Sequence, residues 1–336
     1  MPMSGLYRDH SAYRTIIMDH HPSDLLKAPL DRRDMLMRCT GWAGTAAIYT
    51  MAGGVASSVS LDAALAGGFR HGKNQPFTFL QISDTHIGFD KPANPNARGT
   101  AIEAVEKIKA LPFKPDLIIH SGDITHLSKD EQFDDAKQIL SGLDTPIFFV
   151  PGEHDFLDEK QGAAFLAHFG RGMKGNGWYS FDHGGVHFVA LNNVANLKPG
   201  GMGHIGDDQL AWLQADLAGL SSSTPIVVFG HIPLWTVYEP WGWGTDDSAQ
   251  ALAMLRRFGS VTVLNGHIHQ ILQKVEGNLS FHSALSTAYP QPAPGAAPSP
   301  GPLKVPAEQL PSMLGIRTAR FVRGSAPIAL IDQSLA

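Results

Sequence analysis

The chain has 336 residues, of which 43% are hydrophobic and 17% are charged, so it is long enough to bury a core and is not globally disordered. Its formal net charge of −5 argues against a surface that binds nucleic acid, because such surfaces usually need a basic stripe. With one cysteine, Cys39, the chain can form neither an internal disulfide nor a metal site built from several thiolates.

Residues 1–66 have the features of an export leader. The pair Arg32-Arg33 precedes a weakly apolar stretch, residues 39–65, which ends in the small-residue pattern Ala64-Leu-Ala66. A basic pair, an apolar stretch and a cleavage pattern in this order are typical of a twin-arginine signal peptide. We therefore expect recognition by the export machinery, cleavage after residue 66, a periplasmic or secreted protein, and no permanent membrane span after cleavage. A retained membrane anchor is the alternative, although the many Gly, Ala and Ser residues would make it a poor one.

Strands and helices alternate from residue 77 onward. The hydrophobic periodicity predicts strands over residues 77–83, 116–120, 146–150, 225–229 and 261–264, and helices over 100–111, 128–140, 161–169, 207–220 and 248–258. Two hairpins are expected, with turns at 182–185 and 276–278. This order predicts an α/β protein with two mixed sheets and helices outside. We expect the Pro- and Ala-rich residues 290–306 to be extended coil, and residues 290–336 to form a tail outside the domain.

Five of these strands end in carboxylate or imidazole side chains. The motifs are Asp84-Thr-His86, Gly122-Asp123, Gly152-Glu-His-Asp155, Gly230-His231 and Gly266-His-Ile-His269. Because open α/β sheets form their sites where strands end, we expect one polar cluster assembled from all five. Taken alone, an Asp at such a place is more often a helix cap, so the inference depends on the five motifs together. Oxygen and imidazole ligands without thiolate suit Mn, Fe, Zn or similar ions.

In this order the motifs resemble those of the calcineurin-like metallophosphoesterases, and the resemblance covers roughly residues 77 to 285. It implies a four-layer α/β/β/α sandwich, two mixed β-sheets flanked by helices, for residues 67–289. It also implies two divalent or mixed-valence metal ions. The ligands it implies are Asp84, His86, Asp123 and His269 for the first ion, and Asp123, Glu153, His231 and His267 for the second, with Asp123 bridging.

The same resemblance assigns two catalytic residues. His154 would stabilise the phosphate oxygens and protonate the leaving group, and Asp155 would orient His154. Glu153 departs from the family, which has Asn at this position. We expect Glu153 still to bind the second metal, since hard cations accept carboxylate oxygen readily.

Two further groups of residues leave alternatives open. Trp235, Tyr238, Trp241 and Trp243 follow His231 and could stack on a substrate ring, or could instead pack against the body of the protein. His126 could support a metal ligand or have only a structural role.

The expected function is that of an exported dinuclear-metal phosphoesterase. The resemblance implies hydrolysis of a small phosphodiester or phosphomonoester by attack of a metal-bridging hydroxide. The alternatives are an exported nuclease, a phospholipid-active esterase, or a metal-binding scaffold of the same fold that is catalytically weak.

Overall fold

The computed structural model describes residues 47–48, 76–322 and 328–336, which all belong to one compact unit, Ala43–Ala336. The Arg32-Arg33 pair and the cleavage pattern at residues 64–66 lie outside the described residues. Within the described part of the chain, no helix is long and apolar enough to cross a membrane.

The first sheet has six strands and is mixed. Its order across the sheet is β1 (Ala47–Ile48), β12 (Ala329–Ser334), β11 (Gly315–Phe321), β2 (Phe77–Ile82), β3 (Leu117–His120) and β4 (Ile147–Phe149). β2, β3 and β4 are parallel, while β11 pairs antiparallel with both β2 and β12. The prediction of a tail after residue 289 is therefore wrong, because the last strands extend the sheet beside β2. Because β11 pairs with β2 across more than two hundred residues, no local sequence pattern indicates this pairing.

The second sheet also has six strands. They lie in the order β5 (Tyr179–His183), β6 (Val186–Ala190), β7 (Ile226–Phe229), β8 (Val261–Asn265), β10 (Leu279–Ser283) and β9 (Gln273–Glu276). The four central strands are parallel, and the predicted hairpins form the two antiparallel edges.

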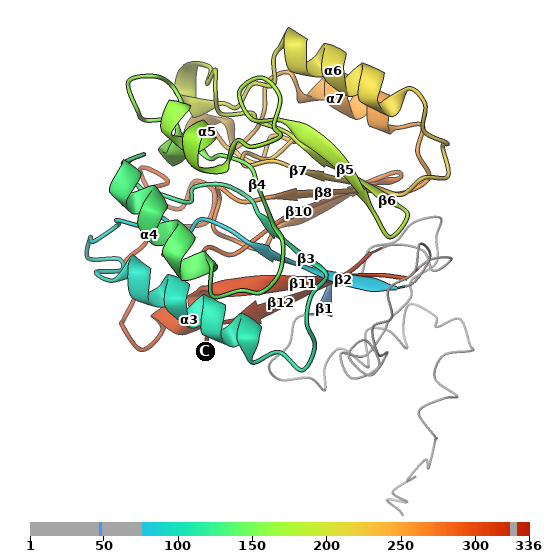
Figure 1. Cartoon of the computed structure of the whole chain (residues 1–336). Helices are drawn as coiled ribbons and strands as arrows, with labels where there is room; N and C mark the ends of the chain where they lie inside the picture. The colour runs from blue at the N-terminus through green and yellow to red at the C-terminus, as the bar shows by residue number, and fades with distance from the viewer. Residues whose placement is uncertain (1–46, 49–75, 323–327) are drawn as a thin grey trace, which may run out of the picture. The chain divides into compact units, whose positions relative to one another are not determined.

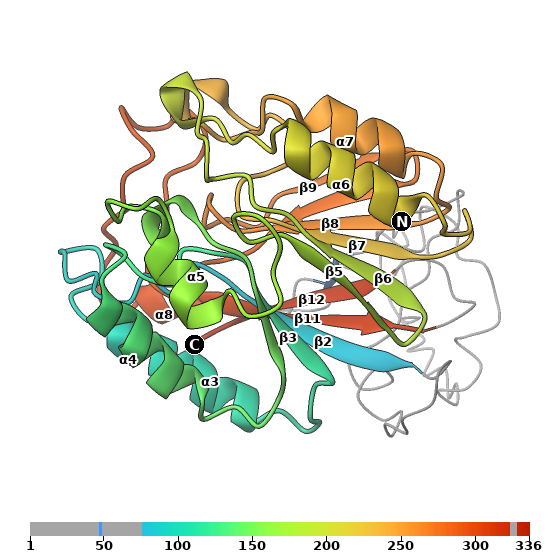
Figure 2. The same ribbon diagram turned by 45° about the horizontal axis from the view of Figure 1, so that its top comes forward.

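Helices cover the outer face of each sheet, as Figures 1 and 2 show. α3 (Ala97–Lys109) and α4 (Asp130–Leu140) pack on the first sheet through a core that includes Ile118 and Phe133. α6 (Asp207–Leu217) and α7 (Ser248–Leu255) pack on the second sheet. A third core, which includes Phe79, Phe188 and Phe229, lies between the sheets. The predicted four-layer α/β class is confirmed.

Short elements complete the described chain: η2 (Glu153–Asp155), α5 (Ala163–Phe169), η3 (Pro199–Gly201), η4 (Glu239–Trp241) and α8 (Leu310–Met313). Ser128, the first residue of the helix predicted over 128–140, has a φ of +53° and does not cap α4. Its hydroxyl instead donates to the carbonyl of His154 at 2.7 Å and accepts from the amide of Leu157 at 2.8 Å. Ser128 therefore ties the start of α4 to the loop that carries His154.

Candidate metal centre

The five motifs meet at the carboxyl ends of the parallel strands of both sheets. β2, β3 and β4 lead into the segments that carry Asp84, Asp123 and Glu153, while β7 and β8 lead to the histidines of the second sheet. Asp84, His86, Asp123, His231 and His269 are at most 1% exposed. Glu153, His154 and His267 are partly exposed, so the cluster is open on one side.

The backbone at this cluster is strained. Seven described non-glycine residues have positive φ, and five of them are expected metal ligands: Asp84, His86, Asp123, His267 and His269. Such conformations are costly for residues with a Cβ and persist where the surrounding structure enforces them, often at functional sites. The amide of His86 donates to the carbonyl of Asp123, and the amide of His267 donates to the carboxylate of Asp84. The loops thus hold one another in the strained conformation.

One half of the cluster is formed by four expected ligands. The Nε2 atom of His86 lies 3.4 Å from Asp123 Oδ2 and 3.4 Å from His269 Nε2. His269 Nε2 in turn lies 3.2 Å from Asp84 Oδ1. Two imidazoles and two carboxylates therefore direct their donor atoms at one point.

The other half centres on Glu153. Its Oε2 lies 2.9 Å from His231 Nε2, and its Oε1 lies 2.9 Å from His267 Nδ1. His231 Nε2 also lies 3.4 Å from Asp123 Oδ2, the oxygen that His86 approaches from the first half. Asp123 therefore lies between the two halves, where a bridging ligand is expected.

The unsatisfied atoms of this cluster fit metal ions. Among the described residues, Glu153 Oε2, His231 Nε2 and both ring nitrogens of His267 are buried and form no hydrogen bond of suitable geometry, although Glu153 lies 2.9 Å from each of these imidazoles. Buried polar groups are normally paired, and three carboxylates in one buried cluster need compensating positive charge. The outward nitrogens of two of the imidazoles are already anchored, because His231 Nδ1 donates to the carbonyl of Ser121 and His269 Nδ1 donates to that of Tyr289. This arrangement leaves Nε2 free for a metal, as in other histidine metal sites.

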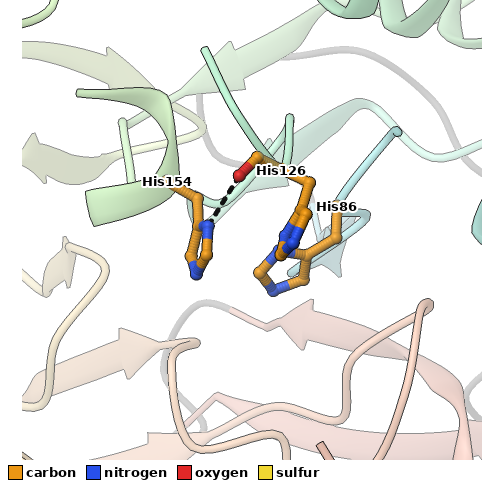
Figure 3. A group of neighbouring side chains, drawn as sticks. All are labelled: His86, His126 and His154. Atoms are coloured by element: carbon orange, nitrogen blue, oxygen red, sulfur yellow. Dashed lines mark hydrogen bonds between the residues drawn. The ribbon is translucent and has the colours of Figure 1, made fainter. Parts of the chain in front are cut away.

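His154 stands beside the cluster with two other imidazoles. Figure 3 shows the rings of His86, His126 and His154 gathered together. His154 Nδ1 donates to the carbonyl of His126 at 2.7 Å, and the two rings stack with centroids 4.7 Å apart. The amide of His154 also donates to Asp123 Oδ1 at 2.9 Å.

The predicted orienting role of Asp155 is wrong in its geometry. The Asp155 carboxylate accepts from the backbone amides of Gly152, Ile124 and Thr125, and from the Thr125 hydroxyl, at 2.8–3.0 Å. Its oxygens therefore fix the conformation of the loop after β3. The group that orients the His154 ring is instead the His126 carbonyl.

The chain matches the family model described as calcineurin-like phosphoesterase over residues 77–271, more than half of its length. It belongs to that family. A 3′,5′-cyclic-nucleotide phosphodiesterase of Nostoc sp. is 24% identical over 220 residues, which cover 64% of this chain and 79% of the relative. A glycerophosphodiester phosphodiesterase of Enterobacter lignolyticus is 28% identical over 207 residues, 56% of this chain and 70% of the relative.

Among solved structures, the fold is similar to that of a dimetal phosphatase from Danio rerio, with a TM-score of 0.55 at 15% identity. The matched region covers 77% of this chain and 96% of the phosphatase chain. A purple acid phosphatase from yellow lupin has a TM-score of 0.58 at 12% identity, over 78% of this chain and 52% of its own. These likenesses show the fold. Family membership and the clustered donor atoms identify the protein as a metal-dependent phosphoric ester hydrolase of a dinuclear-metal family.

Electrostatics within this phosphoesterase centre suit metal binding. In the metal-free protein, burial and then the neighbouring His154 and His269 hold the pKa of His86 well below its ordinary value, so the ring stays neutral, as a metal ligand must be. Burial opposes the ionisation of Glu153, but His267 and His231 outweigh it and keep its pKa well below the usual range. Burial also lowers the pKa of His154, but Asp123 and Glu153 outweigh it, so the net pKa of His154 is raised.

The four aromatic residues after His231 differ in how deeply they are buried. Trp243 is fully buried, so it cannot stack on a substrate of this phosphoesterase. Trp235 packs against the helix-side core of the second sheet, with the Lys274 ammonium 5.5 Å from its ring centroid. Trp235, Tyr238 and Trp241 are all partly exposed, and the rings of Tyr238 and Trp241 meet edge to face at 5.1 Å.

Two site residues were not assigned from the sequence of this phosphoesterase. His126, left open between a structural and a supporting role, places its Nδ1 3.4 Å from His86 Nδ1. Tyr289 was not singled out at all, yet its hydroxyl oxygen lies 3.1 Å from His86 Nε2. The spacing of His126 three residues after Asp123 was a signal for the first, whereas no local pattern marks the second.

Proposed function

We propose that this phosphoesterase is exported and hydrolyses a small phosphodiester. The observation that carries the hydrolytic function is the single cluster of three carboxylates and four imidazoles, with Asp123 between its halves. The two relatives reported above, which cover more than half of the chain, are named as phosphodiesterases, and this favours a diester over a monoester. The acidic net charge favours a small substrate over long nucleic acid.

The geometry of the cluster supports the residue roles in this proposal. Asp84, His86, Asp123 and His269 would hold one ion, and Asp123, Glu153, His231 and His267 would hold the other. Bound ions of this kind supply a water of near-neutral pKa and neutralise the phosphoryl oxygens. His154 has its Nδ1 fixed by the His126 carbonyl, which leaves its Nε2 free to hold a proton for the leaving group.

Metal analysis and a panel of esters test this function. The purified protein, loaded with Mn, Fe or Zn, is assayed with bis(p-nitrophenyl) phosphate, a diester, and p-nitrophenyl phosphate, a monoester. Asp123→Asn is expected to lose both metal and turnover, because it removes the bridging charge. His154→Ala is expected to keep both ions and to lose about 100- to 10,000-fold in rate, most with poor leaving groups.

Two results would contradict these assignments. A fully metallated wild-type protein without turnover of any ester would favour the scaffold alternative. Loss of metal from His154→Ala would mean that His154 is itself a ligand.

Export is the second part of the proposal. It is supported by the Arg32-Arg33 pair, the apolar stretch and the Ala64-Leu-Ala66 pattern in the expected order. Replacing both arginines with lysine is expected to leave the protein in the cytoplasm, since the export receptor reads the pair. The exported wild-type protein is expected to begin near Gly67, and an exported form that begins at Met1 would exclude cleavage.

A further inference from the structure

Tyr289 brings a phenol into the metal centre from outside the matched part of the chain. The family model ends at residue 271, and Tyr289 lies after β10, just before the Pro-rich segment. The residue is 4% exposed. Its hydroxyl oxygen lies 3.1 Å from Nε2 of His86, the ring nitrogen that faces Asp123 and His269.

The position of Tyr289 is fixed by bonds to the loops that carry the expected ligands. Its carbonyl accepts from His269 Nδ1 at 2.6 Å. Its amide donates to the hydroxyl of Ser286, which donates in turn to the carbonyl of Asp84 at 2.8 Å. The ring is held between Phe89 and His86, with centroids 4.3 and 4.8 Å away. Tyr289 is therefore tied to both of the loops that carry Asp84 and His269.

The hydroxyl of Tyr289 needs a different partner once the centre is loaded. A metal bound to His86 would take the Nε2 lone pair that faces the phenol. An ordinary phenol has a pKa near 10, so it carries its proton at neutral pH and can donate a hydrogen bond. A buried donor without an acceptor costs about 1–3 kcal/mol, so another acceptor is expected close by. The phosphoryl oxygens of an ester bound at the centre would supply one.

We propose that Tyr289 is a further substrate-contacting residue, whose hydroxyl donates a hydrogen bond to a phosphoryl oxygen. The proposal rests on the proposed function of the same centre. It also gives a chemical role to the segment after β10, which fixes Tyr289 to Asp84 and His269 at once.

The variant Tyr289→Phe tests the contact, since it removes only the hydroxyl oxygen. Tyr179→Phe is the control: it removes the phenol hydroxyl of a partly buried tyrosine, which donates to the carbonyl of Phe149 at 2.8 Å beside the core between the sheets. Metal content per chain and the dissociation constant of inorganic phosphate are measured on the metal-loaded full chain. Tyr289→Phe is expected to keep both metals and to weaken phosphate binding about 10- to 100-fold, as for a hydrogen bond to a charged group. Tyr179→Phe is expected to leave phosphate affinity unchanged.

The outcomes separate this inference from the proposed function. Unchanged phosphate affinity in Tyr289→Phe would overturn the contact, even if the wild-type protein hydrolyses esters. Loss of metal from Tyr289→Phe would also overturn it, because the hydroxyl would then serve the ions and not the substrate. Weakened phosphate binding in a protein that turns over no ester would support the contact and reject the hydrolytic function.

Discussion

The imidazole of His126 lies against that of His86, with their Nδ1 atoms 3.4 Å apart. The same His126 ring stacks on His154, and the His126 carbonyl accepts from His154 Nδ1. One residue that is not an expected ligand therefore supports both an expected metal ligand and the expected general acid. Partners of this kind fix the orientation of a ligating imidazole.

Two substitutions at His126 separate its contacts. Asn can keep a polar atom near the position of Nδ1 but lacks the ring, whereas Phe keeps the stacked ring but lacks the polar atom; both keep the carbonyl that holds His154. Because the Nδ1 contact orients His86, His126→Phe is expected to weaken metal binding about 10- to 100-fold, and His126→Asn is expected to stay close to the wild type. Metal retained per chain in a series of chelator concentrations measures this. Equal losses in both variants would mean that the stacked ring, not Nδ1, supports the centre.

Much of the centre could be predicted from the sequence because the expected ligands follow closely after strands, which are buried except for the partly exposed β4. The sequence was less informative about the directions in which the side chains of the expected ligands point. On an extended strand, residues two positions apart point to one side, but Asp84 and His86 both have positive φ, of 53° and 41°, and so do not continue the strand. The convergence comes from loop bonds, such as that between the amide of His86 and the carbonyl of Asp123, which no local pattern shows.

Long-range contacts account for what the sequence did not predict. Tyr289 meets His86 across 203 positions of the chain, and β11 pairs with β2 across a similar separation. Asp155 was expected at the ring of its neighbour His154, yet its carboxylate turns to the amides of Ile124 and Thr125 on another loop. Such contacts depend on how loops from distant parts of the chain pack together.

Glu153 provides the second prediction, because it departs from the family's Asn. Its two oxygens reach both His231 and His267 at 2.9 Å, so it is long enough to serve the second metal position. Its negative charge is expected to hold that ion more tightly and to make a bound water less acidic than a neutral amide would. Glu153→Asn should therefore release metal more easily to a chelator. It should also shift the pH–rate profile to lower pH. One ion per chain in the wild type and two in Glu153→Asn would contradict this role.

The aromatic loop provides the third prediction. Trp241 is partly exposed and meets the fully buried Trp243 edge to face, with centroids 5.0 Å apart. Trp243→Ala is expected to lower the free energy of unfolding by about 3–5 kcal/mol, as for other buried aromatic truncations. Trp241→Ala is expected to be milder in stability and, if its ring stacks on substrate, to raise KM for a diester that carries an aromatic ring more than for a small alkyl phosphodiester. An equal rise in KM for both esters, with a lowered Tm, would assign Trp241 to packing alone.

The fourth prediction concerns acid stability and the buried imidazole of His282 on β10. Its two ring nitrogens have no hydrogen-bond partner among the described residues, and burial, followed by Arg317, lowers its pKa to about 3. An unfolded histidine has a pKa near 6.5. Between these two values the unfolded chain binds a proton that the folded chain does not, so the free energy of unfolding falls as pH drops, by about 1.4 kcal/mol per pH unit.

Replacing His282 with leucine removes this proton-binding site. In the metal-free protein, kept so by chelator, His282→Leu is expected to lose about 2 kcal/mol less than the wild type when the pH falls from 7.5 to 5. Leu264→Met, at the strand partner of His282, is the control for packing, and its effect should be the same at both pH values. Chemical denaturation of the three proteins at the two pH values measures the difference. If His282→Leu and the wild type lose the same stability, the buried imidazole does not contribute to the acid sensitivity of the fold, and its proton must be accommodated in the folded state.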